Sequence, residues 1–161
     1  MESYRSLMFL HISAVVFGMG MTFVLPFLQA FAESHGVGAA KFYFAFVRRL
    51  QRVALYPSWA LILAFGVGLI FSDQTGYKDD FPQWLVGAIA WFVALIAFDV
   101  VVMGGFAREA ERILNTLPDD APLPPSYREV SRKLQMFGGL EGLSVLGITF
   151  LMVWGAEGGL N

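Results

Sequence analysis

Residues 84–106 read WLVGAIAWFVALIAFDVVVMGGF, and Asp99 is the only charged residue in this stretch. About 20 consecutive apolar residues in helical form cross the roughly 30 Å hydrocarbon core of a bilayer. The stretch lacks the two-residue alternation of a transmembrane β-strand, and it is also too long for one. It therefore predicts a membrane-spanning helix.

Three further apolar stretches have the same character, at residues 6–31, 54–71 and 135–156. Of the 161 residues, 57% are hydrophobic and 15% are charged, whereas soluble domains average roughly 45–50% apolar and about 25% charged residues. We therefore expect an all-α fold, a polytopic membrane four-helix bundle formed by residues 1–161 as a single membrane domain. The loops at residues 32–53 and 107–134 then lie on the same side of the membrane.

Charge and cysteine content exclude several functional classes. A net charge of −2 gives no sign of a nucleic-acid partner. Because the sequence has no cysteine, it excludes disulfide frameworks, iron–sulfur ligation and thiol catalysis. We also find neither the serine–histidine–acid order of a hydrolase nor a zinc-ligand spacing.

The distribution of basic residues predicts the orientation in the membrane. Nine of the eleven lysines and arginines fall in the loops at residues 32–53 and 107–134. They are Lys41, Arg48, Arg49, Arg52, Arg108, Arg112, Arg128, Arg132 and Lys133. Because basic loops face the cytoplasm, we expect an inner cell membrane protein with both termini on the outer side.

A cleaved signal peptide is the competing interpretation of the first apolar stretch, because Ala30-Phe31-Ala32 resembles a cleavage site. The stretch is far longer than the usual apolar region of about 7–15 residues in signal peptides. Glu2 and Arg5 also leave the preceding segment without the net positive charge that a signal peptide needs. We therefore retain the first stretch as a span.

The segments that flank the spans carry helix signals of their own. The proline-rich stretch PDDAPLPP at residues 118–125 cannot continue a helix. The S-x-x-E spacing of residues 126–129 follows it and predicts that the last helix begins near Tyr127. Three tryptophans near the span ends suggest an aromatic belt: Trp59, Trp84 and Trp154.

Residues 41–54, KFYFAFVRRLQRVA, form a two-faced segment before the second span. At about 100° per residue, its four basic side chains gather on one side and its apolar side chains fill the opposite side. The basic side chains are Lys41, Arg48, Arg49 and Arg52. One interpretation is an extension of the second span that packs on the first. The other is an interfacial helix that contacts anionic lipid head groups or a partner.

Three ionisable residues, His11, Asp99 and Glu141, fall within the spans. Such residues are costly in lipid and are functional candidates by default. Asp99 and Glu141 fall at nearly the same depth on adjacent antiparallel helices. Gly138 and Gly142 have the spacing that lets helix backbones approach closely.

Asp99 and Glu141 therefore form a predicted polar intramembrane seam. Two carboxyls in a medium of low dielectric constant do not both stay ionised, so at least one should be protonated. A shared proton suits a relay or a proton-coupled transport site. The alternative is structural: each acid faces a water-filled cleft, or is neutral and bonded to the backbone or to Ser144.

His11 is a candidate haem or metal ligand near the outer end of the first span. Met8 lies one turn away on the same face and is a weaker candidate ligand. His35 is 24 positions further along, which is about 36 Å in a helix and excludes ligation by both histidines within one subunit. The alternatives for His11 are a structural histidine and a member of a proton relay.

Two parts of the chain resemble a family of small bacterial integral membrane proteins of unknown function. Leu10-His11, followed by an apolar helix that contains glycines, resembles the family's first helix. YREVSRKL at residues 127–134 and FLMV at residues 150–153 resemble its terminal pattern. The family is in turn distantly similar to the copper-resistance D-type proteins and to the membrane protoporphyrinogen oxidases.

The resemblance carries over one functional position, His11, because the oxidase relatives associate the corresponding histidine with haem. Those relatives also use polar residues in other helices that have no match in this chain. The resemblance implies haem b as the cofactor to test, but it does not extend to oxidase activity. Asp99 and Glu141 come from the residues alone.

These observations lead to one leading function hypothesis and two alternatives. We expect a non-enzymatic multi-pass membrane protein, a transport-related or accessory component in contact with the bilayer. Its partners would be further copies of itself or another membrane subunit. The first alternative is a haem-associated redox protein or oxidase that uses His11. The second is a membrane-anchored interaction subunit that docks through its basic segment and proline-rich loop.

Overall fold

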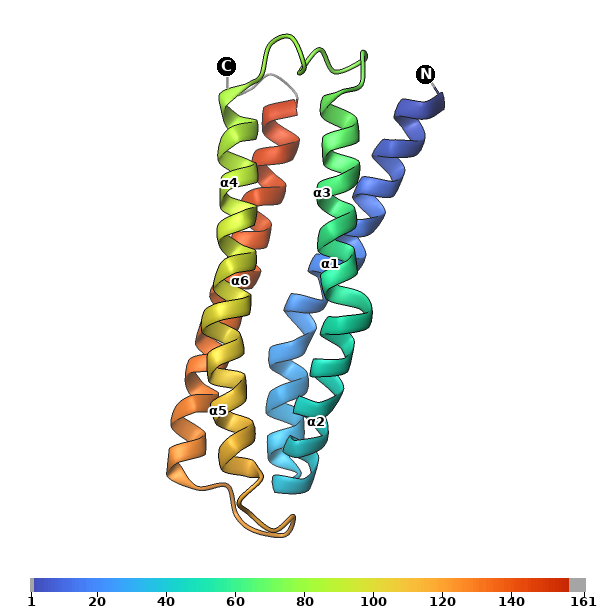
Figure 1. Ribbon diagram of the computed structural model, residues 1–161. Helices are drawn as coiled ribbons and strands as arrows, with labels where there is room; N and C mark the ends of the chain where they lie inside the picture. Colours follow the sequence, from blue (N-terminus) through green and yellow to red (C-terminus); the bar gives the residue numbers. More distant parts are fainter. Residues whose placement is uncertain (1, 157–161) are drawn as a thin grey trace.

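Four long helices make up most of the part of the chain that the computed structural model describes, residues 2–156 (Figure 1). The first is α1 (Glu2–Ser34) and the last is α6 (Pro125–Ala156). The second helix runs without a break through α2 (Val37–Leu50), η1 (Gln51–Leu55) and α3 (Tyr56–Ile70). The third runs likewise through α4 (Gln83–Phe98), η2 (Asp99–Met103) and α5 (Gly104–Leu114). The segments η1 and η2 are single stretches of π-helix.

The predicted fold class is confirmed. Residues 2–156 contain helices and loops and no strand, and each of the four helices is long and apolar enough to cross a membrane. The predicted spans lie within these helices, except that Phe71 follows the end of α3. The helices extend beyond the apolar stretches, and α6 begins at Pro125, two residues before the predicted start.

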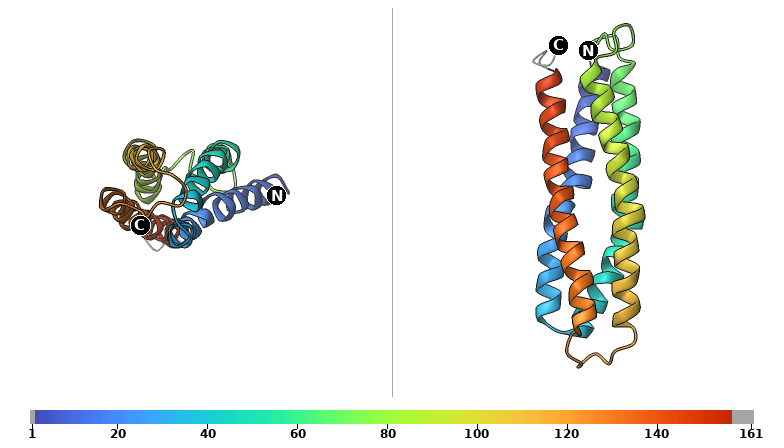
Figure 2. Two further views of the ribbon diagram at one scale, coloured as in Figure 1. Left: turned by 90° about the horizontal axis from the view of Figure 1, so that it is seen from below. Right: turned by 90° about the vertical axis from the view of Figure 1, so that its left-hand side faces the viewer.

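The ends of the described chain lie at one end of the bundle, and the α1–α2 and α5–α6 connections lie at the other. Glu2 and Ala156 lie at the same end as the loop at residues 71–82 (Figures 1 and 2). The α1–α2 and α5–α6 connections lie at the other end, which we call the basic end.

In loop 71–82, a hydrogen bond from Lys78 lowers the pKa of the exposed Asp73 carboxyl.

The bundle consists of two halves that meet along α1 and α6. In one half α1 packs against α3, and in the other α6 packs against α4 and α5. α1 and α6 pack against each other, and α2 reaches across to α5 at the basic end. α3 and α4 do not pack against each other, although they are consecutive spans (Figure 2). The halves are therefore joined by the α1–α6 and α2–α5 contacts.

Glycines on α6 allow two tryptophans of α4 to pack against its backbone. Trp91 packs on Gly147 and Trp84 packs on Gly155, so closely that a side chain at either glycine would collide with the indole ring. Trp84 is consequently only 8% exposed. The aromatic-belt interpretation is therefore wrong for Trp84, whereas Trp154 is half exposed as a belt residue would be.

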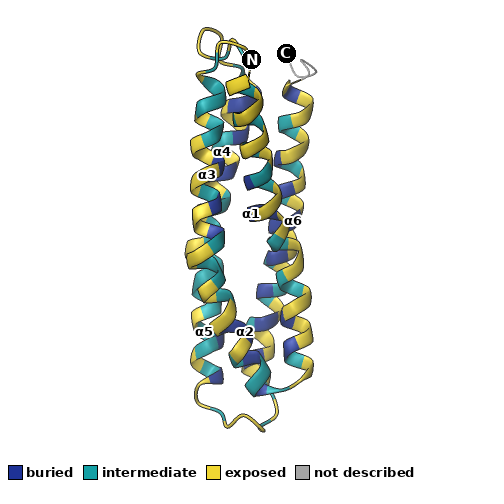
Figure 3. Cartoon of the chain, turned by 90° about the vertical axis from the view of Figure 1, so that its right-hand side faces the viewer, coloured by how far each residue is buried: buried dark blue, intermediate teal, exposed yellow. Residues whose placement is uncertain are grey.

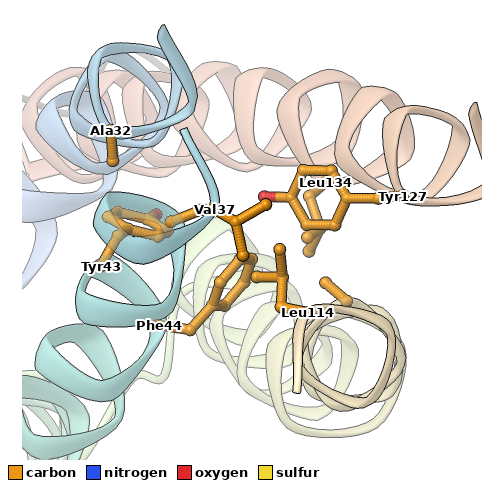
Figure 4. Packing of buried hydrophobic residues seen from close by; sticks show 9 residues of the cluster. Ala32, Val37, Tyr43, Phe44, Leu114, Tyr127 and Leu134 are labelled. Atoms are coloured by element: carbon orange, nitrogen blue, oxygen red, sulfur yellow. The ribbon is translucent and has the colours of Figure 1, made fainter. Parts of the chain in front are cut away.

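Two clusters of buried apolar residues fill the bundle. The cluster at the basic end joins α1, α2, α5 and α6 around Tyr127 (Figure 4). It consists of Ala32, Val37, Ala40, Tyr43, Phe44, Ala110, Leu114, Tyr127 and Leu134. The second cluster lies nearer the termini and joins α1, α3, α4 and α6. It consists of Ala14, Met19, Ile62, Phe92, Val145 and Ile148.

The outward surface of the helices is largely apolar, as Figure 3 shows by the exposed residues along every helix. On α1, Phe9, Val16 and Phe27 are each at least two-thirds exposed. A soluble monomer rarely exposes an apolar surface of this extent. The surface is that of a helix bundle whose solvent is lipid.

A hydrogen-bond cluster around Glu33 joins the end of α1 to the start of α6. Glu33 Oε1 accepts hydrogen bonds from Gln29 Nε2 at 2.9 Å, the Tyr127 hydroxyl at 2.9 Å and Ser131 Oγ at 2.7 Å. Glu33 Oε2 accepts one from Gln135 Nε2 at 3.3 Å. No lysine or arginine in residues 2–156 forms an ion pair with Glu33. Neutral donors therefore stabilise this carboxylate, and we call the five residues the Glu33 cluster.

Tyr127→Phe tests how much the Glu33 cluster contributes to stability. The variant keeps the buried ring and removes a hydroxyl that donates to a carboxylate, so we expect it to lower the free energy of unfolding by about 1.5–3 kcal/mol. Thermal unfolding in detergent measures the change. The matched control is Tyr77→Phe in loop 71–82, which should change the free energy by less than about 0.5 kcal/mol. Equal stability of the two variants would contradict a stabilising role of the cluster.

Candidate functional site

A small cavity lies inside the second apolar cluster, between α1, α3, α4 and α6. Its volume is about 20 Å³, which is room for roughly one water molecule. It is lined by Met19, Thr22, Trp59, Phe92, Leu95, Ile96, Asp99, Glu141 and Val145. Both halves of the bundle therefore contribute to its wall.

The two carboxylates singled out in the sequence, Asp99 and Glu141, both line this cavity. Glu141 is only 5% exposed. Asp99 Oδ2 and Glu141 Oε1 are buried and have no hydrogen-bond partner among the residues that the structure describes. Buried polar atoms in native proteins are nearly always paired. These two oxygens are therefore available to a proton, a water molecule or an ion.

Asp99 occupies a distinctive position in its helix, the first residue of the π-helical segment η2. The carbonyl of Asp99 accepts its hydrogen bond from the N–H of Gly104, five residues on, instead of four as in an α-helix. Single π-helical turns within α-helices are frequent at functional sites. The third helix therefore contributes Asp99 to the cavity at the point where the helix changes from α-helical to π-helical geometry.

Glu141 lies between two glycines that bring α6 close to α1. A Cβ on Gly142 would lie 3.2 Å from Phe23 Cε1, and one on Gly138 would lie 3.4 Å from Pro26 Cγ. Phe23 and Pro26 of α1 fill the space that the glycines leave, so the glycine spacing serves the α1–α6 contact. Gly138 also faces the third helix, because a Cβ there would lie 3.8 Å from Met103 Cε.

Thr22 and Trp59 also line the cavity, although the sequence patterns described above mark neither of them as a site residue. The Thr22 hydroxyl donates to the carbonyl of Met19. Pro26 lies inside α1 and has no N–H, so the Thr22 carbonyl lacks the partner that a regular helix would supply four residues on. A threonine four residues before a proline within a span is the signal that could have pointed to this position.

His11 packs against α3. Its Nδ1 lies 3.0 Å from the carbonyl of Ile62, and since a carbonyl only accepts, this nitrogen carries the proton. Gly66 leaves room for the ring, because a Cβ there would lie 3.3 Å from His11 Cε1. The ring is thereby held between two turns of α3.

Among the described residues, the structure brings no second histidine to His11. His35 lies at the basic end of α1, where its Nδ1 is 2.8 Å from the Phe31 carbonyl, so it cannot serve as a second ligand. Neither His11 nor Met8 lines the cavity described above. Residues 2–156 also contain no group of three or more His, Asp or Glu side chains that could hold a metal ion. We therefore derive no chemistry from a haem at this position.

The four basic residues of the segment at 41–54 divide into two pairs. Lys41 Nζ donates to Asp119 Oδ1 at 2.7 Å and to the Leu117 carbonyl at 2.8 Å, and Arg48 forms an ion pair with Glu111. Arg49 and Arg52 are exposed and form no ion pair within residues 2–156. Because α2 continues into α3 and packs on α1 and α5, its geometry matches the packed-extension interpretation.

Comparison with known proteins identifies a family. A family model described as "Predicted integral membrane protein (DUF2269)" matches residues 5–155. Neither a curated protein nor a solved structure matches the chain. The distant similarity to copper-resistance D-type proteins and protoporphyrinogen oxidases gains no support from these comparisons and stays a hypothesis. The match to the family model covers nearly the whole chain, and the protein therefore belongs to the DUF2269 family of integral membrane proteins.

Proposed function

We propose that this integral membrane protein is a transport-related or accessory membrane component in which Asp99 and Glu141 bind and exchange a proton. The observation that carries the proposal is the pair of buried carboxyl oxygens, Asp99 Oδ2 and Glu141 Oε1, which line one cavity without partners. Ionisable residues at membrane depth mark proton relays and ion pathways.

The energetics of burial support a shared proton. A carboxylate buried without a counter-ion is strongly disfavoured, and a second one beside it raises the cost further. At least one carboxyl of the pair therefore keeps its proton. A proton that is shared by two acids can also be transferred to a further group. A proton relay requires this transfer.

The position of the cavity supports exchange with water. Residues of both halves line it, and these halves are joined along α1 and α6 but not between α3 and α4. A small change in the packing of one half against the other would therefore change the access of water to the pair. Motions of this kind, in which packed helices slide or pivot, are common in proteins that alternate between two states.

The charge distribution supports an inner membrane location with the basic end in the cytoplasm. Nine of the eleven lysines and arginines fall in residues 32–53 and 107–134, which form the two connections of the basic end and the helix ends beside them. Basic loops of this length are retained on the cytoplasmic side. Both termini and loop 71–82 would then lie on the outer side.

Single-cysteine variants test this orientation, because the sequence contains no cysteine of its own. Asp79 and Asp120 are exposed residues of the two opposite ends. A membrane-impermeant maleimide should label Asp79→Cys in intact spheroplasts and should label Asp120→Cys only after the membrane is opened. Gel shift of the labelled protein measures both. The reverse pattern would invert the proposed orientation.

Neutral variants of the acids test the proton site. Asp99→Asn and Glu141→Gln keep size and shape but cannot bind and release a proton, so each should reduce proton flux about tenfold or more in proteoliposomes. A pH-sensitive dye reports the flux under an imposed membrane potential. The matched controls are Glu109→Gln and Glu129→Gln, which remove exposed acids paired with Arg112 and Lys133. If Asp99→Asn and Glu141→Gln both fold and retain the flux of these controls, the proposal fails.

The second candidate function, a membrane-anchored interaction subunit, is favoured by one observation. Arg49 and Arg52 are exposed, as are Phe42 and Phe46 of α2, and the two arginines form no ion pair within the described chain. Such a surface suits anionic head groups or an acidic partner. This candidate would be preferred if the acid variants left proton flux unchanged.

An optical spectrum of the purified protein separates the haem-associated alternative from the structural role of His11. Because His11 is packed against α3, we expect no Soret band after expression in haem-replete cells. We expect His11→Ala to lower the free energy of unfolding by about 1–3 kcal/mol, since it leaves the Ile62 carbonyl without its side-chain donor. A Soret band that disappears in His11→Ala would reverse this assignment.

A further inference from the structure

The side-chain oxygens of the cavity come from three of its nine lining residues, Thr22, Asp99 and Glu141. The two carboxyl oxygens Asp99 Oδ2 and Glu141 Oε1 have no partner. Most of the remaining wall consists of apolar and aromatic side chains, which exclude bulk water. An occupant of the cavity must therefore bind mainly to these side-chain oxygens.

Thr22 contributes its oxygen as an acceptor. A threonine hydroxyl has a single hydrogen, and Thr22 donates it to the Met19 carbonyl within the same helix. The lone pairs of Thr22 Oγ1 remain free to accept a hydrogen bond or to bind a cation. Pro26 has no N–H, so the Thr22 carbonyl has no α-helical partner four residues on. The side-chain oxygens of Thr22, Asp99 and Glu141 can all act as acceptors towards an occupant, which favours a positively charged one.

Size and charge narrow the class of that occupant. The cavity of about 20 Å³ holds roughly one water-sized particle. Ca²⁺ takes about 6–8 oxygen ligands, and Mg²⁺ retains several of its waters, so both need more ligands or more room. A monovalent cation loses its water ligands at a lower cost than a divalent cation does. With one carboxyl ionised and the other protonated, it also leaves the site electrically neutral.

Building on the proton site proposed above, we propose that the cavity binds one dehydrated monovalent cation of about the size of sodium in exchange for a proton, with Asp99, Glu141 and Thr22 as its ligands. Without the cation the pair holds two protons and is neutral, and once one proton has left, the two acids share the other. When the cation enters, one carboxyl releases its proton to water and its oxygen binds the cation. The charge of the site is unchanged, so neither state leaves an unpaired charge in lipid.

The cation and the proton compete for Asp99 and Glu141, because these two are the only titratable residues that line the cavity. Proton release on cation binding therefore measures the protonation of these two acids. α1 contributes Met19 and Thr22, α3 contributes Trp59, and α4 and α6 contribute otherwise apolar side chains. Tyr56 of α3 lies close enough to Asp99 to interact with it electrostatically, but it does not line the cavity. His11 is bound to the Ile62 carbonyl, and Glu33 lies within its own cluster.

Sodium-induced proton release from the intact purified protein tests the inference. In weakly buffered detergent solution, NaCl should release protons from the wild-type protein and choline chloride should not. In proteoliposomes that are acidic inside, the wild-type protein should take up ²²Na⁺. Thr22→Val should weaken both sodium responses about tenfold, because it removes one ligand while keeping the shape of the side chain. Thr22→Ser should restore them, because it restores the hydroxyl.

Thr149→Val is the matched control. The Thr149 hydroxyl also donates to a backbone carbonyl, that of Val145, at 2.8 Å, but Thr149 does not line the cavity. It should respond to sodium as the wild type does. Sodium responses of Thr22→Val equal to those of Thr149→Val would remove Thr22 from the site.

The two proposals fail in different ways. If sodium releases no more protons than choline while Asp99→Asn and Glu141→Gln still abolish proton flux, the cation inference is overturned and the proton site stands. If sodium-dependent release persists in Asp99→Asn and in Glu141→Gln, the cation binds elsewhere and the inference is equally overturned. Loss of both sodium responses in each acid variant, with normal responses in Glu109→Gln, supports it.

Discussion

The contact between α1 and α6 is the constraint on which the rest of the bundle depends. The Glu33 cluster secures it at the basic end, and the close approach of Phe23 and Pro26 to Gly142 and Gly138 secures it further along. In lipid the hydrophobic effect does little to hold helices together, so close packing and hydrogen bonds must do so. α3 packs on α1 and α4 packs on α6, and the backbones of α3 and α4 make no close contact with each other.

The same contact sets the position of the candidate site. Gly138 and Gly142 flank Glu141, so the packing that draws α6 onto α1 also places this carboxyl beside Thr22. The proline that packs on Gly138 is the one that deprives the Thr22 carbonyl of its helix partner. The same few residues of α1 and α6 therefore both hold the two helices together and position the candidate site. Asp99 is contributed separately, by the π-helical segment of the third helix.

The spans and the acid pair were predictable from the sequence because they depend on local composition. A run of apolar residues is visible without knowing its neighbours, and a single Asp or Glu within such a run is conspicuous. Thr22 and Trp59 were not predictable as site residues, because which side of a helix faces a cavity depends on its packing. Glu33 was assigned to a loop, since it follows the first apolar stretch, although it lies within α1. The π-helical turns leave no periodicity that a sequence pattern detects.

The missing contact between α3 and α4 has a consequence for how the chain can be divided. Loop 71–82 is the only covalent link between the half that ends with α3 and the half that begins with α4. The close backbone contacts between these halves run along α1–α6 and α2–α5, and side chains of both halves meet around the cavity. Each half is a helical hairpin, and the fold is the docked product of two such hairpins. The polypeptide is therefore modular in the sense that two separately synthesised fragments carry all the surfaces needed to assemble it.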